Sequence, residues 1–377
     1  MAAVPYDVVS TEEARTLAAR EPLSFLHVSR AEVDLPAGTP PYSAEVYARA
    51  VTNMAALRRQ APLVREESPS LYVYRLEREG LSQTGVAGTF SIDEYETNLI
   101  KRHERTRKDK EDDRTRHIVE LRAQTGPVFL VHRHHEDVRR LTARIVDTGE
   151  PLYDFTADDG VRHSVWRAPA QDAADLVQAF AAIDALYIAD GHHRAASAAR
   201  ARQQAGGTGT FLAVAFQDRE VRILPYNRVV LDLADTDRAS FVRLLRDRFG
   251  ATEGAATPGG RGEVSVFVDR WYRVPLAADG ASGALDVTLL QERILEPVLG
   301  IGDVTRDKRI DFVGGGRGTE ALEQLVRTGA AAVAFSMHPV SMDDIMRVSD
   351  AGGIMPPKST WFEPKLRDGL LSHLTHE

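Results

Sequence analysis

The stretch Leu186-Tyr187-Ile188-Ala189-Asp190-Gly191-His192-His193-Arg194 decides the fold of this 377-residue chain. Its four leading apolar residues predict a buried strand, and the alanine-rich segment 193–204 predicts a helix that ends before Gly206-Gly207. Asp190-Gly191 is then a strand-to-helix turn. The first amides of a helix have no internal partners, and the helix dipole favours an anion at that end. The turn therefore indicates a phosphate-binding site.

Each side chain of this turn suits phosphate chemistry. Gly191 lets a ligand approach the backbone, and Arg194 can offer a bidentate fork to phosphate oxygens. Asp190 can hold Mg²⁺ or accept a proton, and His192 or His193 can move protons. In the alternative reading Asp190 caps the helix and the histidines are buried hydrogen-bonding groups. Spacing alone does not choose between them, although adjacent histidines rarely reach one zinc ion.

Composition narrows the class of protein. The net charge of −8 disfavours a nucleic-acid binder, and the absence of cysteine excludes disulfides, thiolate nucleophiles and cysteine-ligated metals. No apolar run is long enough to cross a bilayer, and residues 1–6 lack the features of a secretory signal. We therefore expect a cytoplasmic protein without a membrane or nucleic-acid partner.

Strand and helix patterns mix along the chain and predict a mixed α/β (α+β) fold. We expect a core over 1–234 and a C-terminal α/β lobe over 235–377, whose final segment can return to the site. The Gly/Pro/Ala-rich loop 250–262 is a candidate lobe boundary. The further expected elements are strands at 24–28, 71–76, 86–90, 128–131, 264–268, 310–313 and 331–335, a hairpin of 211–216 with 221–224, and helices at 173–183, 239–249, 285–299 and 319–327.

A second group of charged residues precedes the turn. The capping box Ser91-Ile92-Asp93-Glu94 predicts a helix, which we extend through 100–104, and another helix is expected at 113–124. Phosphoryl transfer needs positive charge on the moving phosphate and a carboxylate near the attacking hydroxyl. Glu104 is therefore the candidate base, with His103 and Arg114 as phosphate or substrate contacts. Alternatively, these charged residues lie on the solvent-exposed surfaces of two helices and have no catalytic role. We prefer this interpretation for residues 108–112.

Three further motifs carry weaker signals. Met355-Pro356-Pro357-Lys358-Ser359-Thr360 offers a lysine and two hydroxyls to an anion, or is a rigid strand with a solvent-facing lysine. His132-Arg133-His134-His135 resembles a metal-binding motif, but no carboxylates are spaced to act as further ligands. Gly314-Gly315-Gly316-Arg317-Gly318 lacks the Lys-Ser/Thr of a phosphate loop, and such runs are common connectors.

The run Tyr187–Ala195 resembles the signature of a widespread prokaryotic family of unknown function, numbered 1015. Nearly the whole chain shares this resemblance, in several motifs that follow the same order. The other matching segments are Pro5-Tyr6-Asp7-Val8, 24–28, Ile100–Thr106 with Asp113-Arg114, Ile354–Thr360, Phe362 and Pro364-Lys365-Leu366.

That family is similar to the ParB/sulfiredoxin fold and, within it, to the free-serine kinases. The resemblance implies a core of that fold with an added C-terminal α/β lobe, and a phosphotransferase that converts free serine or a similar small hydroxy amino acid. It also implies ATP or ADP as phosphate donor, with Mg²⁺. The implied roles are catalytic for Glu104, Asp190 and His193, nucleotide-binding for Gly191, His192, Arg194 and Lys358, substrate-binding for His103, Arg114, Ser359 and Thr360, and metal-binding for Asp190.

Other functions stay open at this point. A nucleotide-binding, ParB-like switch or regulatory protein would use the same turn without kinase activity. A sulfiredoxin-like repair enzyme is disfavoured, because the chain has no cysteine nucleophile. The sequence does not distinguish ATP from ADP, nor say which of His192 and His193 faces the ligand. It leaves the oligomeric state open, a homodimer included.

Overall fold

A computed structural model describes residues 1–61, 63–234, 236–276 and 284–376. They form two compact units, one of Met1–Val221 with Pro364–Glu377 and the other of Arg222–Glu363. The boundary expected at 234/235 thus falls inside the second unit, because strand β11 (Tyr226–Val230) pairs with β15 (Ile310–Gly314) and β16 (Val333–Met337) of that unit. The last residues belong to the first unit.

The first unit is built on an eight-stranded sheet with the order β3-β8-β5-β9-β2-β1-β7-β6. Most neighbours are antiparallel, but β3 and β8 run parallel, as do β5 and β9. The strands are β1 (Tyr72–Arg78), β2 (Leu81–Ser91), β3 (Ile100–Lys101), β5 (Val128–His132), β6 (Tyr153–Thr156), β7 (Arg162–Arg167), β8 (Leu186–Asp190) and β9 (Thr210–Gln217).

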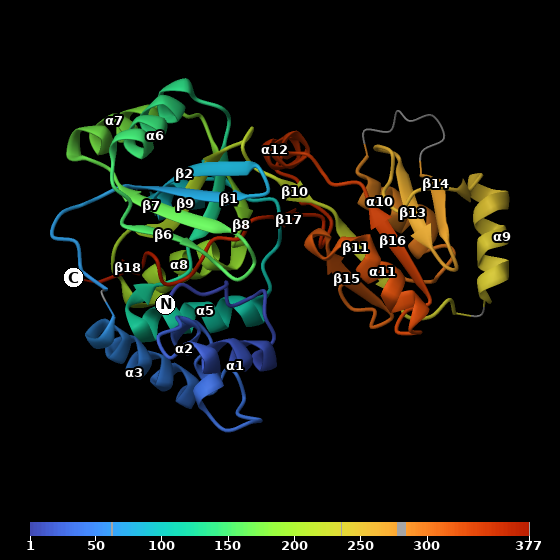
Figure 1. Cartoon of the computed structure of the whole chain (residues 1–377), viewed down its shortest axis with the longest axis horizontal. Helices are drawn as coiled ribbons and strands as arrows, with labels where there is room; N and C mark the ends of the chain where they lie inside the picture. The colour runs from blue at the N-terminus through green and yellow to red at the C-terminus, as the bar shows by residue number, and fades with distance from the viewer. Residues whose placement is uncertain (62, 235, 277–283, 377) are drawn as a thin grey trace. The chain divides into compact units, whose positions relative to one another are not determined.

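Helices cover both faces of this sheet (Figure 1). Alternate residues of a strand point to opposite faces, so each face of the central strands carries its own apolar row. One face packs on α4 (Ile92–Glu96), α5 (Lys108–Leu121) and the small alanines of α8 (His192–Ala205). The other packs on α6 (Glu136–Thr148) and α7 (Ala170–Ala181). The expected strands at 71–76, 86–90 and 128–131 and the helix at 173–183 are confirmed.

The N-terminal residues form a helical layer: α1 (Thr11–Arg20), α2 (Leu26–Ser29), a 3₁₀ turn η1 (Ala31–Asp34) and α3 (Ala44–Gln60). The strand expected at 24–28 was wrong. No strand in the described part of the chain pairs with this apolar run, and its side chains Phe25, Leu26 and Val28 are buried among α1 and α3 instead. Ser24 Oγ also accepts a hydrogen bond from the Leu26 amide at 3.3 Å, which favours a helical start.

The extended helix expected through 100–104 was also wrong. Ser91 does cap α4, but that helix ends at Glu96, and Asn98 then takes a left-handed conformation with φ of 63°. Ile100 and Lys101 pair in parallel with Leu186 and Tyr187. This pairing buries Ile100 fully, and the free energy gained by burying its side chain outweighs the local preference for a helix. His103 and Glu104 consequently lie in the loop between β3 and α5.

The expected hairpin around Asp218-Arg219 does not form. Strand β9 matches the prediction, but it lies between β5 and β2. The segment after it becomes β10 (Ile223–Leu224), which pairs with β17 (Trp361–Phe362) in the second unit.

The second unit contains a six-stranded antiparallel sheet with the order β12-β14-β13-β16-β11-β15. The loop 250–262 lies within this unit and includes β12, so it is not a lobe boundary. The helix expected at 285–299 begins as α10 and continues as a π-helical turn at Gln291–Leu295. The remaining elements are β12 (Thr252–Glu253), β13 (Glu263–Phe267), β14 (Trp271–Pro275), α9 (Arg238–Phe249), α10 (Asp286–Leu290), α11 (Gly318–Arg327) and α12 (Met342–Asp350).

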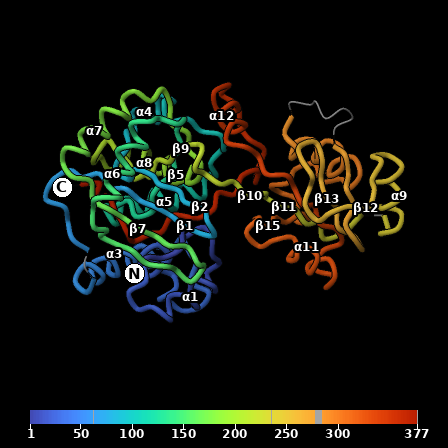
Figure 2. Tube along the Cα trace, turned by 45° about the horizontal axis from the view of Figure 1, so that its top comes forward, coloured from blue at the N-terminus to red at the C-terminus, as the bar shows by residue number. Residues whose placement is uncertain are grey.

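The final segment returns into the first unit, where its dark red trace can be followed in Figure 2. Asp368 forms a backbone bridge with Ala3, and β18 (His373–Leu374) pairs with β4 (Ala123–Gln124). The expectation of a mixed α/β fold is confirmed, with a separate sheet in each unit. Among the described residues, no helix has the length and apolar character needed to span a bilayer.

Candidate functional site

The turn between β8 and α8 has the predicted strand-to-helix form. Residues 186–189 are buried at the sheet, and Gly191 is the N-cap of α8, with φ of 94° and ψ of 29°. These angles lie in the left-handed region that favours glycine. A Cβ atom here would also stand 2.8 Å from Nε of Arg194, which folds back over the turn. Glycine is therefore needed both for the backbone angles and for the packing of Arg194.

Asp190 is held between two cations. Its Oδ2 accepts a hydrogen bond from Arg194 at 2.7 Å, and its Oδ1 lies 3.4 Å from Nζ of Lys365 in the returning segment. Burial alone would raise the pKa of Asp190, but Lys365 and then Arg194 outweigh it and hold that pKa well below its usual range. Asp190 is thus a carboxylate at any ordinary pH, and a cation already contacts each of its oxygens.

Arg194 is buried and serves the turn itself. Besides Asp190, its guanidinium donates to the carbonyl of Pro127 and lies 3.9 Å from Asp7. Its Nε has no hydrogen-bond partner among the described residues. The predicted phosphate-binding arginine therefore also fixes the Asp190 carboxylate against the start of α8.

Asp368 is a buried carboxyl group beside this ion pair. It is 1% exposed, and its Oδ2 has no hydrogen-bond partner among the described residues. Burial raises the pKa of Asp368 to about 7, which Arg194 opposes and Asp7 reinforces. Asp368 consequently binds a proton in the folded chain at a pH where it is ionised in the unfolded chain.

We expect Asp368 to make folding stability depend on pH. The native state binds more protons than the unfolded state between about pH 4 and 7, so the free energy of unfolding falls as pH rises. Asp368→Asn mimics the protonated group, so it should remove this dependence of the free energy of unfolding on pH. The dependence amounts to a few kcal/mol in total, on the order of 1.4 kcal/mol per unit of pKa shift. Urea unfolding at pH 5 and 7.5 measures this, with the exposed Asp147→Asn as control. Equal slopes in Asp368→Asn and wild type would contradict the expectation.

Helices α5 and α8 lie side by side and run in the same direction. The backbone amide of Arg107, the N-cap of α5, donates to Nε2 of His193 at 3.0 Å. Further along, Ser197 Oγ donates to the carbonyl of Glu111 at 3.2 Å, and Arg200 pairs with Asp112 at 2.5 Å. In these three contacts the residue number rises along α5 and along α8 at the same time, so the two helix axes are parallel.

Two helix N-termini therefore meet at His193. The positive ends of their dipoles add at this point, which favours a bound anion more than one helix end would. His193 is engaged in this contact, and burial lowers its pKa. This arrangement supports the anion site and places His193 as a bridge between the helices.

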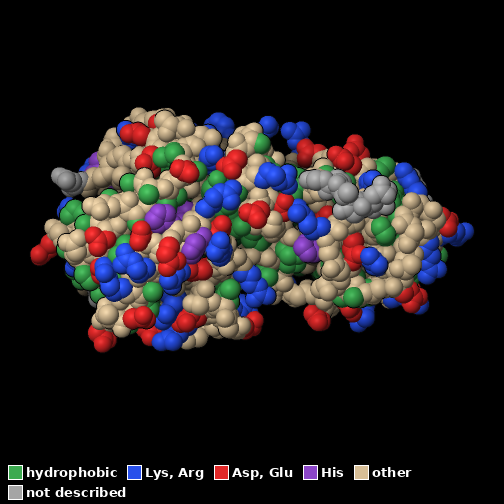
Figure 3. Space-filling view, turned by 90° about the horizontal axis from the view of Figure 1, so that it is seen from above, with side chains coloured by type: hydrophobic (Ala, Val, Ile, Leu, Met, Phe, Trp, Pro, Cys, Tyr) green, Lys and Arg blue, Asp and Glu red, His purple; other side chains and the backbone are tan. Residues whose placement is uncertain are grey.

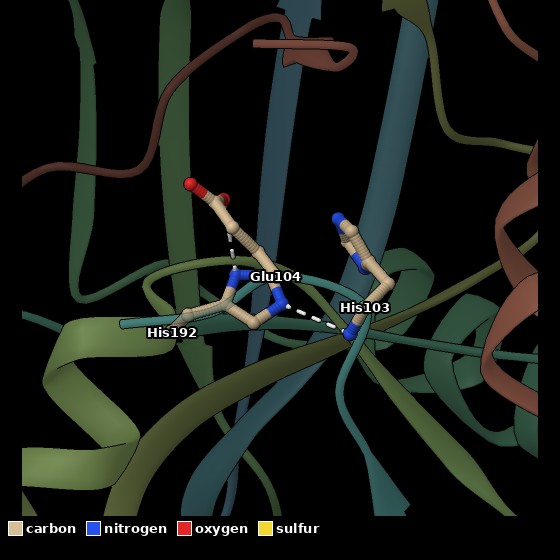
Figure 4. A group of neighbouring side chains, drawn as sticks. All are labelled: His103, Glu104 and His192. Carbon is tan, nitrogen blue, oxygen red and sulfur yellow. Dashed lines mark hydrogen bonds and ion pairs between the residues drawn. The ribbon is translucent and has the colours of Figure 1, made fainter. Parts of the chain in front are cut away.

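His192 points to another group, which contains His103 and Glu104 from the loop after β3 (Figure 4). Nδ1 of His192 lies 3.7 Å from Oε2 of Glu104, and its Nε2 accepts a long hydrogen bond of 3.5 Å from the His103 amide. The two imidazole rings are 4.4 Å apart at an angle of 84°. Each of the three residues offers a ligand atom, and these atoms lie within 4.8 Å of one another.

Both of these histidines are buried and neutral. Burial lowers the pKa of His103 to about 4, although Ile188 and Asp190 partly oppose the shift. Burial, reinforced by His103, also lowers the pKa of His192 well below its usual value. Glu104 is half-exposed. A reachable carboxylate thus stands beside two uncharged imidazoles at the start of α8.

Arg114 lines a cavity of about 310 Å³ among the N-terminal elements. Its guanidinium lies 4.2 Å from the ring of Tyr6 and bonds to the adjacent Asp113 at 2.7 Å, which in turn accepts a hydrogen bond from Tyr47. The cavity has aromatic, basic and acidic walls. Its other polar lining residues include Arg30, Glu32, Tyr42, Lys110 and His117.

Three predicted contacts belong to the second unit. The backbone carbonyl of Lys358 accepts from Arg228 at 3.3 Å, and its Nζ lies over the ring of Tyr226. Ser359 Oγ donates to the Pro356 carbonyl at 2.6 Å, and Thr360 is half-buried. A role for these residues at the site of the first unit stays a prediction.

The histidine motif at 132–135 and the glycine run at 314–318 make ordinary structural contacts. Nδ1 of His132 faces the carbonyl of Arg133 at 2.8 Å, and His134 pairs with Glu136 at 3.4 Å. In the glycine run, a Cβ at Gly314 would stand 2.8 Å from Trp361. That run is a packed connector between β15 and α11.

Four residues of the site were absent from the predicted set. Tyr6, Asp7 and Lys365 lie in motifs that carried the family resemblance, so that likeness could have pointed to them. Asp368 had no such signal, because only the returning final segment brings it to Arg194.

The chain belongs to the protein family of unknown function DUF1015, whose model matches residues 1–292. No curated protein sequence matches it significantly.

Among solved structures the chain shows a distant likeness to three proteins. A free serine kinase in complex with AMP is 13% identical, with a TM-score of 0.39 over 73% of this chain and 86% of that one. SbnI from Staphylococcus aureus with a C-terminal truncation is 12% identical, with a TM-score of 0.42 over 75% and 85%. A conserved hypothetical protein from Pyrococcus furiosus is 15% identical, with a TM-score of 0.37 over 75% and 93%.

Proposed function

We propose that this protein is a nucleotide-dependent kinase that phosphorylates the hydroxyl of free serine or a similar small hydroxy amino acid. One observation carries the proposal. The loop after β3 brings the Glu104 carboxylate to within 3.7 Å of His192, at the point where the N-termini of α5 and α8 meet. An anion site and a candidate proton acceptor are thereby adjacent, as phosphoryl transfer to a hydroxyl requires.

The nucleotide phosphates occupy the turn in this proposal. Backbone amides of 192–194 and the aligned dipoles of α5 and α8 favour their negative charge. Arg194 and Lys365 both pair with the Asp190 carboxylate, and the two cations together leave a net positive charge beside the turn. Gly191 has no Cβ atom, which leaves room for the Arg194 guanidinium at the turn. His193 has a supporting role, because its Nε2 bonds to the start of α5.

Glu104 acts as the general base. As the hydroxyl oxygen bonds to the terminal phosphorus, the bond from that phosphorus to the nucleotide breaks, and Glu104 accepts the hydroxyl proton. The carboxylate is half-exposed, so an acceptor molecule can reach it. His192 and His103 form the uncharged wall beside it.

The cavity at Arg114 is the site we assign to the carboxylate and ammonium of the acceptor amino acid, whose hydroxyl has to extend beyond the cavity to Glu104, a residue that does not line it. Its volume of about 310 Å³ suits a small molecule. Arg114 and Asp113 can pair with the carboxylate and ammonium of a zwitterion. The cavity is also close to the turn, since Tyr6 lines it and the next residue, Asp7, lies 3.9 Å from Arg194.

The residues around Asp190 do not fit the predicted Mg²⁺ ion well. Magnesium prefers several oxygen ligands in octahedral geometry, whereas each oxygen of Asp190 already contacts a cation. An ion bound there would have to displace Lys365. ATP or ADP remains the proposed donor, and no step is assigned to a metal at Asp190.

A direct assay tests the kinase proposal. Purified full-length protein is incubated with serine and either ATP or ADP, in Mg²⁺ or Mn²⁺, and phosphoserine is measured by mass spectrometry. We expect phosphoserine to form with at least one donor, and a panel of threonine, homoserine and related hydroxy amino acids ranks the acceptors. Nucleotide binding without any phosphorylated amino acid would contradict the proposal and favour the nucleotide-gated switch.

On the face drawn in Figure 3, basic and acidic side chains are interspersed, which does not favour a nucleic-acid surface.

A further inference from the structure

We propose that His103, Glu104 and His192 form a binding site for one divalent transition-metal ion, of the class of Mn²⁺, Fe²⁺, Co²⁺ or Zn²⁺. The inference goes beyond the proposed function, and it rests on the geometry of these three side chains. Two imidazoles and one carboxylate are a common ligand set for such ions and leave positions open for water or substrate.

The ligand atoms are almost at coordination distance from one another. With metal–ligand bonds of about 2.1 Å, two ligands of a tetrahedral ion stand roughly 3.4 Å apart. The Glu104–His192 separation is 3.7 Å, and all three ligand atoms lie within 4.8 Å. Figure 4 shows His192 joined by dashed lines to the Glu104 carboxylate and to the backbone nitrogen of His103. Glu104 is half-exposed, so a small rotation of its side chain can bring its carboxylate to the ion.

His103 supplies a second, independent indication of a ligand. It is 1% exposed, and among the described residues only the Ile188 backbone acts on its ring as a hydrogen-bond partner, so at least one of its buried ring nitrogens is unsatisfied. Leaving a buried polar group unsatisfied is costly, and such groups in native proteins usually have a partner. A metal ion on one nitrogen would satisfy it, and the Ile188 backbone is placed to hold the proton on the other.

The charges also match a metal site, because the two imidazoles are buried and stand beside a carboxylate. The ion would in turn compensate the negative charge of Glu104.

The adjacent residues His192 and His193 contact different parts of the site. His193 turns to the N-terminus of α5, whereas His192 turns to Glu104. The second imidazole of the metal site therefore comes from His103, on a loop distant in sequence. The ligand types distinguish this site from one for Mg²⁺, which prefers oxygen. The site is compatible with the proposed kinase, because a carboxylate bound through one oxygen keeps the other for a proton.

Metal binding can be measured without nucleotide or serine, so its outcome is independent of the kinase assay. Full-length protein is stripped with a chelator and titrated with MnCl₂, with bound Mn²⁺ followed by electron paramagnetic resonance. ZnCl₂ is tested by equilibrium dialysis with elemental analysis. We expect one ion per chain, and a Kd at least tenfold weaker in His103→Gln, His192→Gln and Glu104→Ala. His132→Gln is the matched control, since His132 is also buried in the first unit but lies outside the group.

Two results would overturn the inference. One is the absence of stoichiometric binding of either metal by wild type, and the other is unchanged binding by the three variants. Glu104→Ala protects the test against misfolding, because the half-exposed Glu104 can be replaced at little cost to the core. The thermal midpoint gives a second readout: added metal should raise it in wild type and in His132→Gln, but not in the ligand variants.

Discussion

Glu104→Gln is expected to lower kcat for phosphoserine formation by about 10²–10⁴-fold, the usual contribution of a general base. The amide keeps the size of the side chain but cannot accept the hydroxyl proton. Nucleotide affinity should change little, because the proposed phosphate contacts come from the turn at 191–194. Steady-state kinetics and nucleotide titration of the same preparation measure the two quantities.

Glu96→Gln is a suitable control for this experiment. Glu96 is an exposed carboxylate in α4 that accepts a hydrogen bond from Gln203, far along α8 from its N-terminus. It should retain wild-type kcat. A Glu104→Gln variant with full activity would exclude Glu104 as the base. The histidine variants of the metal site separate loss of the base from loss of an ion, because they keep the carboxylate.

Arg194→Met is expected to reduce the free energy of unfolding by about 3–5 kcal/mol, as when one partner is removed from a buried ion pair. Arg194 is 4% exposed and contacts both Asp190 and the Pro127 carbonyl. Methionine retains much of the apolar stem but leaves the Asp190 carboxylate with Lys365 alone. Chemical denaturation of the full chain measures the loss.

A double-mutant cycle tests whether the pair is the cause. Asp190→Asn removes the charge that Arg194 compensates, so the double variant should lose less stability than the sum of the single losses, by about 0.5–3 kcal/mol. Arg139→Met provides the contrast, because its pair with Glu136 is exposed to solvent and its loss should change the free energy of unfolding little. Strict additivity at Arg194 and Asp190 would show that the pair does not hold the turn.

Local signals predicted the elements that depend on local chemistry. The capping motif at Ser91 starts a helix as expected, because a side-chain oxygen satisfies a free amide whatever surrounds it. The apolar run 128–131 and the alanine-rich α8 also form as predicted, since burial and propensity agree there. Predictions failed where distant partners decided the outcome. Ile100 pairs in parallel with Leu186 instead of lying in the expected helix, and Leu26–Ser29 form a short helix where a strand was expected.

The candidate site divides in the same way. Gly191, Arg194 and Glu104 could be singled out from residue type and order, because phosphate sites favour a glycine turn, an arginine and a separate carboxylate. Lys365 and Asp368 could not be placed, since the final segment reaches Asp190 and Arg194 only after the chain folds back. The grouping of His103 with His192 likewise depends on β3 pairing with β8.

The sequence alone determined the strand-to-helix turn at 186–194, because a buried apolar run, a glycine and an alanine-rich helix act on their immediate neighbours. It also determined the likeness to the family, through motifs whose order can be read directly. The tertiary structure decided which charges meet at that turn, how α5 aligns with α8, and which histidine faces Glu104. These depend on contacts between residues far apart in the chain, and the spacing of residues within one segment does not specify them.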